Sequence, residues 1–220
     1  MPEAFQQYPD DISLESLLEH ARRNEQIARN LFEIERDIMG CRDCAAFVDR
    51  LVDRVRERFQ LDEVWLVLTD VEANQPLHSM LEEDGALSLL VTAPAADYLN
   101  LTGGSHSPVL IPETKSYQRL IPAGWRDSIR SMAVLPLVLE DRLAGGLVLG
   151  TRTMGRYSRE MDAFFLEQLA VKASMGLDSA LAREQLRRLA TRDALTGLRN
   201  RREMETVLHK ELSRSRRYHL

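Results

Sequence analysis

The stretch Ser131-Met132-Ala133-Val134-Leu135-Pro136-Leu137-Val138-Leu139, followed closely by Leu143-Ala144-Gly145-Gly146-Leu147-Val148-Leu149-Gly150, decides the fold of this chain. Both runs are almost wholly apolar, and short apolar runs bounded by turn signals predict buried strands. The polar Glu140-Asp141-Arg142 between them favours an antiparallel hairpin. Gly145-Gly146 inside the second run predicts a bulge or the close approach of another backbone. We therefore expect a sheet built around this hairpin.

Shorter apolar runs upstream predict the remaining strands. Val64–Leu68 is apolar at every position, which is typical of a central strand covered on both faces. Asn74-Gln75-Pro76 breaks the chain before an expected strand at Leu77–Leu81, and Leu87–Val91 is a further apolar run. Val109–Ile111 is flanked by prolines, so we expect it at an edge of the sheet.

The segment from Thr92 to Ile129 has no periodicity and is rich in proline and glycine. Loops of this length inside a compact domain are uncommon and usually functional. A ligand pocket between this segment and the sheet would use its polar and aromatic residues, unless these only pack or cap the loop. The candidates are Tyr98, His106, Tyr117, Arg119, Trp125 and Arg130. The ligand would be an unknown small molecule, and the alternative is that there is none.

The first long helix is expected from Ser13 to Met39. Apolar or small residues recur there at steps of three and four, if Asn24 and Glu35 are counted in the same seam. The apolar and small members are Leu14, Leu17, Ala21, Ala28, Leu31 and Ile38. This pattern predicts either a coiled-coil partner or an amphipathic helix that packs on its own domain, and both can hold together.

Two further helices complete the expected elements. The first spans Asp43 to Phe59, with apolar and charged residues on opposite sides. The second is expected to run unbroken from Arg159 to Leu189, with Ser158 as its N-cap. Its apolar stripe shifts phase near Ala180–Ala182, which in a coiled coil is a stutter.

Composition excludes several classes of protein. No run of about 18 apolar residues predicts a membrane span, and the polar N-terminus is not a signal peptide, so we expect a cytoplasmic protein. The net charge is −5, yet the stretch 183–220 is basic. Its basic residues are interleaved with glutamates and it holds few aromatics, so we expect an exposed basic helix rather than a nucleic-acid site.

Cys41 and Cys44 are the only cysteines and form a single Cys-x-x-Cys. Tetrahedral zinc needs four ligands, and no second Cys or His pair has suitable spacing, so we expect no metal centre within one chain. The two cysteines can be interpreted as a redox pair, as ligands of a metal that bridges two subunits, or as two ordinary reduced thiols.

The region 41–181 resembles a GAF domain. The resemblance rests on Ile129-Arg130-Ser131, on the hairpin quoted above and on Ser107-Pro108-Val109-Leu110-Ile111-Pro112; the stretch Thr151–Leu181 is also similar to a smaller GAF-like family of unknown function. It implies an α+β fold with an antiparallel sheet of five or six strands, helices on one face and a ligand pocket on the other. The sequence lacks the cyclic-nucleotide motif and the pocket cysteines of the bilin-binding and methionine-sulfoxide-reducing members. His78 and His106 are the only candidate haem ligands, and we do not expect haem.

The stretch Asp193-Ala194-Leu195-Thr196-Gly197-Leu198-Arg199-Asn200-Arg201-Arg202 resembles the opening of GGDEF domains, the diguanylate cyclases that join two GTP into cyclic di-GMP. The resemblance implies that Asp193, Thr196, Gly197, Asn200 and Arg201 form the turn between a linker helix and the catalytic domain. GTP and Mg²⁺ would bind in the part of that domain absent here. We therefore expect no catalytic residues in this chain.

Taken together, the patterns predict a loose segment 1–12, a helix 13–40, a sensor domain 41–181, a linker helix 182–192 and the start of a GGDEF domain at 193–220. The expected function is a dimeric sensory module of a bacterial diguanylate cyclase. The homodimer would form through the N-terminal and linker helices, with a small molecule as effector. The alternatives are a GAF domain that only dimerises or binds a small molecule, an enzyme in its own right, and a nucleic-acid binder through the basic tail.

Overall fold

The computed structural model describes residues 14–41, 43–83, 89–158 and 161–192, together with residues 198, 200, 204–205, 208–209 and 214. The main helices are α1 (Leu14–Ile38), α2 (Cys44–Phe59), α3 (Gln75–Glu83), α4 (Ala95–Thr102) and α5 (Phe164–Thr191). The strands are β1 (Glu63–Thr69), β2 (Leu90–Ala93), β3 (Val109–Ile111), β4 (Ser131–Leu139) and β5 (Arg142–Thr151). Short 3₁₀ helices are η1 (Glu72–Asn74), η3 (Lys115–Leu120) and η4 (Ala123–Trp125).

The strands form one five-stranded sheet in the order β2-β1-β5-β4-β3. The expected hairpin is confirmed as β4–β5, in which Val134 pairs with Val148, and β3 lies at an edge as predicted. The α+β fold is confirmed, but the sheet is mixed because β2 runs parallel to β1. Parallel neighbours need a crossover, and η1 and α3 supply it.

The predicted strand at Leu77–Leu81 is wrong, because these residues lie in α3. Leu77, Met80 and Leu81 are buried, and their spacing of three and four residues is helical. Pro76 lies in the first turn of α3, where proline is tolerated since its missing N–H has no helical partner. Five residues, of which Leu77, Met80 and Leu81 are apolar, are too few to separate a helical from a strand period.

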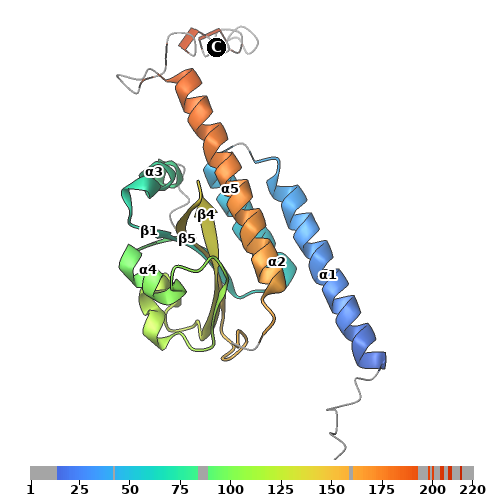
Figure 1. The fold of residues 1–220 in the computed structure, drawn as a ribbon. Coiled ribbons are helices and arrows are strands. Elements are labelled where there is room, and N and C mark those ends of the chain that lie inside the picture. The colour runs from blue at the N-terminus through green and yellow to red at the C-terminus, as the bar shows by residue number, and fades with distance from the viewer. Residues whose placement is uncertain are drawn as a thin grey trace, which may run out of the picture.

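The central strands are covered on both faces, as their continuous apolar runs predict. Helices α1, α2 and α5 lie on one side of the sheet, and α4 lies on the other (Figure 1). Leu120 of η3 and Trp125 of η4 pack in the core on the α4 side. On β1, Leu66 and Leu68 belong to the core under the long helices, whereas Trp65 and Val67 belong to the opposite core. This alternation divides the interior into two cores, one on each face of the sheet.

Gly145 and Gly146 allow close approaches, as expected. A Cβ at Gly145 would lie 2.0 Å from the carbonyl oxygen of Val67 on β1, and one at Gly146 would lie 2.6 Å from the hydroxyl oxygen of Tyr98. The register shifts between Leu137 and Val138 on the neighbouring strand β4. Only glycine lets β1 and α4 come so near to β5.

Helix α1 packs on its own domain through part of the predicted seam. Leu31 and Ile38 are buried there, while Leu17 is exposed. Ion pairs reinforce the contact: Arg58 on α2 reaches Glu33 at 2.8 Å. Lys172 on α5 also pairs with Glu35. Only the N-terminal end of α1 extends beyond the body of the domain (Figure 1).

Helix α5 is unbroken to Thr191, but its predicted start is wrong. It begins at Phe164, and Ala163 occupies the N-cap position. The carboxylate of Asp162 accepts a hydrogen bond from the Phe164 backbone N–H at 2.9 Å, whereas the Ser158 carbonyl accepts one from Met161 in a local turn. Within the described residues, no helix has the length and apolar character needed to cross a bilayer.

Candidate functional site

The edge strand β3 borders an open cleft of about 600 Å³. Pro108 and Pro112 bracket the strand, which pairs only on its β4 side, where Leu110 lies opposite Ala133. Proline at both ends of an edge strand discourages the addition of another strand. The cleft is therefore open to a small molecule rather than shaped as a sheet extension.

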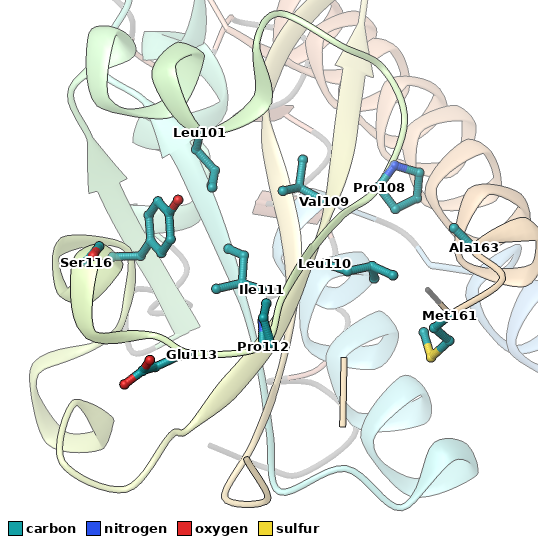
Figure 2. A pocket seen from close by; sticks show the side chains of 11 residues that line it. Leu101, Pro108, Val109, Leu110, Ile111, Pro112, Glu113, Ser116, Met161 and Ala163 are labelled. Carbon is teal, nitrogen blue, oxygen red and sulfur yellow. The ribbon is translucent and has the colours of Figure 1, made fainter. Parts of the chain in front are cut away.

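The alternation of β3 side chains gives the cleft two walls (Figure 2). Val109 and Ile111 point to the side of Leu101 from the end of α4, while Leu110 points towards Met161 and Ala163. Met161 and Ala163 immediately precede α5. A molecule in the second part of the cleft would thus touch the residues that start the long C-terminal helix.

Polar and apolar groups share the surface of the cleft. The polar side chains are those of Glu113, Ser116 and Tyr117, and Glu113 is already paired with Lys115 at 2.7 Å. The cleft is thus more polar than the mostly apolar pockets that usually hold drug-sized molecules, which favours a small polar ligand. In the part of the chain that the structure describes, no group of three or more His, Cys, Asp or Glu side chains could hold a metal ion. The arrangement suits reversible binding.

Three of the predicted pocket residues lie in or near the core on the α4 side of the sheet. Tyr117 lines the cleft. Tyr98 is fully buried, its hydroxyl donates to the Gly145 carbonyl at 2.5 Å, and burial raises its pKa, so it stays a neutral donor. Trp125 packs against Trp65 with ring centroids 5.7 Å apart.

The other three predicted residues are dispersed. His106 lines a separate groove that also includes Val138 and Met175. Arg119 pairs with Asp97 at 3.2 Å on the surface, and Arg130 has an exposed side chain. The structure therefore does not bring the six residues into one site, and their contact with a ligand stays a prediction.

The space between the sheet and the 92–129 segment is largely packed. Its fully buried side chains come from both the strands and the irregular segment, and they are Trp65, Tyr98, Ile121, Ile129 and Met132. Sequence reasoning missed the actual cleft residues Pro108, Leu110, Met161 and Ala163. The proline bracket around the edge strand was the available signal, because it marks an exposed edge.

The two cysteines lie at the start of α2. Cys44 is buried, and the half-buried Cys41 places its sulfur 3.5 Å from the Ala46 carbonyl oxygen. Burial raises the pKa of the Cys41 thiol, which lowers its thiolate fraction and reactivity. The redox pair remains a prediction.

The end of α5 is tied to the motif that follows it. The Asn200 backbone N–H donates to the Thr191 carbonyl at 2.8 Å, and its side-chain amide donates to the Ala190 carbonyl at 2.7 Å. Both carbonyls lie in the last turn of a helix, where they have no helical partner. The predicted roles of Asp193, Thr196, Gly197 and Arg201 fall outside the described residues.

Comparison with family models gives a match over residues 10–179, to the family described as protein of unknown function, DUF484. A search of curated proteins gives no match. The matched region contains α1, the whole sheet and the first half of α5.

Solved structures share the architecture at low identity. The GAF domain of a phosphoenolpyruvate-protein phosphotransferase from Coxiella burnetii aligns with a TM-score of 0.51 and 13% identity, over 74% of this chain and 96% of that one. The phytochrome photosensory core module of Stigmatella aurantiaca aligns with a TM-score of 0.51 and 14% identity, over 75% of this chain and 39% of that one. At such identity the likeness concerns the fold alone, which is the GAF-like fold expected from the sequence.

Proposed function

We propose that this chain, which belongs to the family described as protein of unknown function DUF484, is a signal-sensing regulatory module whose output leaves through α5. The observation that carries the proposal is the course of this helix. Its 28 residues span about 42 Å, from the sheet to the turn before Asp193. Ser174 anchors it to the sheet by accepting a hydrogen bond from the Val138 backbone N–H at 3.0 Å. Its C-terminal end extends past the sheet (Figure 1).

The input in this proposal is a small molecule in the cleft beside β3. Met161 and Ala163 line that cleft and directly precede α5, so a bound molecule can favour one position of the helix over another. A ligand shifts such an equilibrium only by its difference in affinity for the two positions. A module that dimerises without any ligand is the simpler form of the same proposal.

The output we propose is a diguanylate cyclase domain that begins at Asp193 and continues beyond this chain. Joining two GTP needs two catalytic domains face to face, so the module would act as a homodimer. Exposed apolar side chains along both long helices support this, since such stripes mark interaction surfaces. They are Leu17, Leu18 and Phe32 on α1, Met39 directly after it, and Val171, Met175, Leu186 and Leu189 on α5.

The test of the relay uses the intact gene product and measures its synthesis of cyclic di-GMP. Four residues inserted at Ala182 rotate the following helix relative to the sensor, whereas seven residues restore the rotational phase of a heptad seam. We expect the four-residue insertion to change cyclase output and the seven-residue insertion to leave it near the original level. Equal effects of the two insertions would contradict a relay through α5.

The ligand part of the proposal has a separate test. A metabolite that binds the folded chain raises its melting temperature, and the stabilisation grows with the logarithm of its concentration once this exceeds Kd. We expect at least one such compound, and expect Leu110→Trp, which fills the cleft, to abolish its effect. If screening finds none, the module works by dimerisation alone.

A further inference from the structure

A second cavity of about 600 Å³ lies within the helical layer and shares Met161 with the edge-strand cleft. It is bounded by the first half of α1, the first turns of α5 and the chain around the end of β5, and we call it the α1–α5 cavity. Its floor is apolar and includes Ile27, Leu61, Leu149, Phe165 and Leu169. Leu149 and Leu169 are each 2% exposed, so the cavity reaches down to the main core.

The rim of the α1–α5 cavity is cationic. Arg23 comes from α1 and Arg156 from the segment after β5. Asp162 is the carboxylate among the lining residues, and Asp62, which accepts hydrogen bonds from Thr151 and Arg152, also interacts with Arg156 from outside the lining. Arg23 makes no ion pair in the described part of the chain, and Arg156 donates one hydrogen bond of 3.3 Å to the Phe59 carbonyl. Asp162 already accepts a hydrogen bond from Phe164. The two guanidinium groups therefore retain donors for an anion.

Tyr157 adds a hydroxyl donor near Arg156. Its side chain lines the cavity, the residue is only 4% exposed, and its hydroxyl makes no hydrogen bond within the described residues. Among the described residues, every fully buried polar side-chain atom has a hydrogen-bond partner. Because the Tyr157 hydroxyl has none, its oxygen is not fully buried and is accessible to a ligand or to water. Burial raises the pKa of Tyr157 to about 12, against the opposing effect of nearby Arg156, so the hydroxyl keeps its proton at neutral pH.

We propose that the α1–α5 cavity binds an amphiphilic monocarboxylate, such as a medium-chain fatty acid. The carboxylate would be held by Arg156, Arg23 and the Tyr157 hydroxyl, and the alkyl chain would lie on the apolar floor. The volume is in the range of small-molecule sites, and arginine is the preferred partner of carboxylates. Such a ligand would bridge α1 and α5. The inference concerns binding alone and does not depend on the proposed relay.

Calorimetric titration of the 220-residue chain with decanoate, and with decanol as the uncharged control, tests the site. We expect one saturable decanoate site per chain and at least tenfold weaker binding of decanol. Arg156→Gln and Tyr157→Phe should each weaken decanoate binding by about tenfold and leave decanol binding unchanged. Arg22→Gln is the matched control, because Arg22 adjoins Arg23 but is not among the lining residues.

A cavity-filling variant locates the ligand. Leu166 lines the cavity and is half-buried, so Leu166→Trp should abolish decanoate binding while the chain stays folded by circular dichroism. Equal binding of decanoate and decanol, or unchanged affinity in the Arg156 and Tyr157 variants, would overturn the carboxylate site. Absence of saturable binding would do the same. If Leu166→Trp then dissociates a dimer, a second copy of the chain covers the cavity.

Discussion

Gly145 is the residue at which the sheet has no room for a side chain. The nearest atom to a Cβ there is the Val67 carbonyl oxygen at 2.0 Å, which is backbone and cannot rotate away. We expect Gly145→Ala to lower the free energy of unfolding by more than about 3 kcal/mol, measured by urea denaturation. In the control Gly124→Ala, the new Cβ meets nothing within 4 Å, and the change should stay within about 0.5 kcal/mol. Equal urea midpoints for the two variants would contradict the argument.

Glu184 is a buried carboxylate near the end of α5, with a relative exposure of 1%. It accepts hydrogen bonds from Arg187 at 2.6 and 2.8 Å and from Arg188 at 3.0 Å. The bonds from Arg187, with a smaller contribution from Arg188, hold its pKa below the ordinary value although burial raises it. A carboxyl whose pKa is lowered by folding stabilises the fold above its unfolded pKa, and this contribution disappears as the pH falls towards the folded pKa.

The expected consequence is that Glu184→Gln lowers stability at pH 7 by about 1 to 3 kcal/mol and flattens its dependence on pH below about 4.5. Urea midpoints measured between pH 7 and pH 3 check both effects. Glu167→Gln, an exposed change in the first turn of the same helix, should leave the pH profile unaltered. A parallel profile for wild type and Glu184→Gln would show that the arginine contacts do not stabilise the fold.

At the scale of the elements, one face of α1 is buried in the core and another is exposed to solvent. Ile34 is 2% exposed and belongs to the core with α2 and α5, whereas Phe32 is 64% exposed on the same helix. We expect Ile34→Ala to destabilise the chain by about 2 to 4 kcal/mol, because it leaves a cavity. Phe32→Ala should change the stability of the monomer by less than about 0.5 kcal/mol. Thermal unfolding of the two variants at low protein concentration separates these outcomes.

The elements also show where sequence reasoning succeeds and where it stops. The β4–β5 hairpin was predictable. Its strands are nine and ten residues long, which is enough sequence to recognise a strand, and the turn between them is polar. Helix α3 was not, because its buried residues also fit a short strand. Because α3 forms the crossover between β1 and β2, missing this helix also meant missing the parallel pairing of the two strands.

At the scale of the whole molecule, we expect the chain to form a homodimer through the exposed apolar stripes of α1 and α5. Met175 is 68% and Leu189 is 74% exposed, so a charge at either position should not disturb the fold but should oppose burial against a second copy. Light scattering after size exclusion should give a dimer for the wild type and a monomer for Met175→Glu with Leu189→Glu. Leu99→Glu, on the opposite side of the sheet, should remain dimeric. A wild type that is monomeric at high concentration would remove the dimer proposal.

The hairpin, the central strand, the long helices and the GAF-like α+β fold were predictable from the order of residues alone, since these depend on periodicity and local turn chemistry. The motif after Asp193 also emerged from sequence alone. Only the tertiary structure decided where open space remains. The six residues predicted for one pocket lie in several places. The space that they were expected to surround is filled by buried side chains, among them Trp65, Ile129 and the predicted pocket residue Tyr98 itself. Cavities arise where elements distant in the chain fail to fill the volume between them, as at β3 and between α1 and α5, and no local pattern of residues records that mismatch.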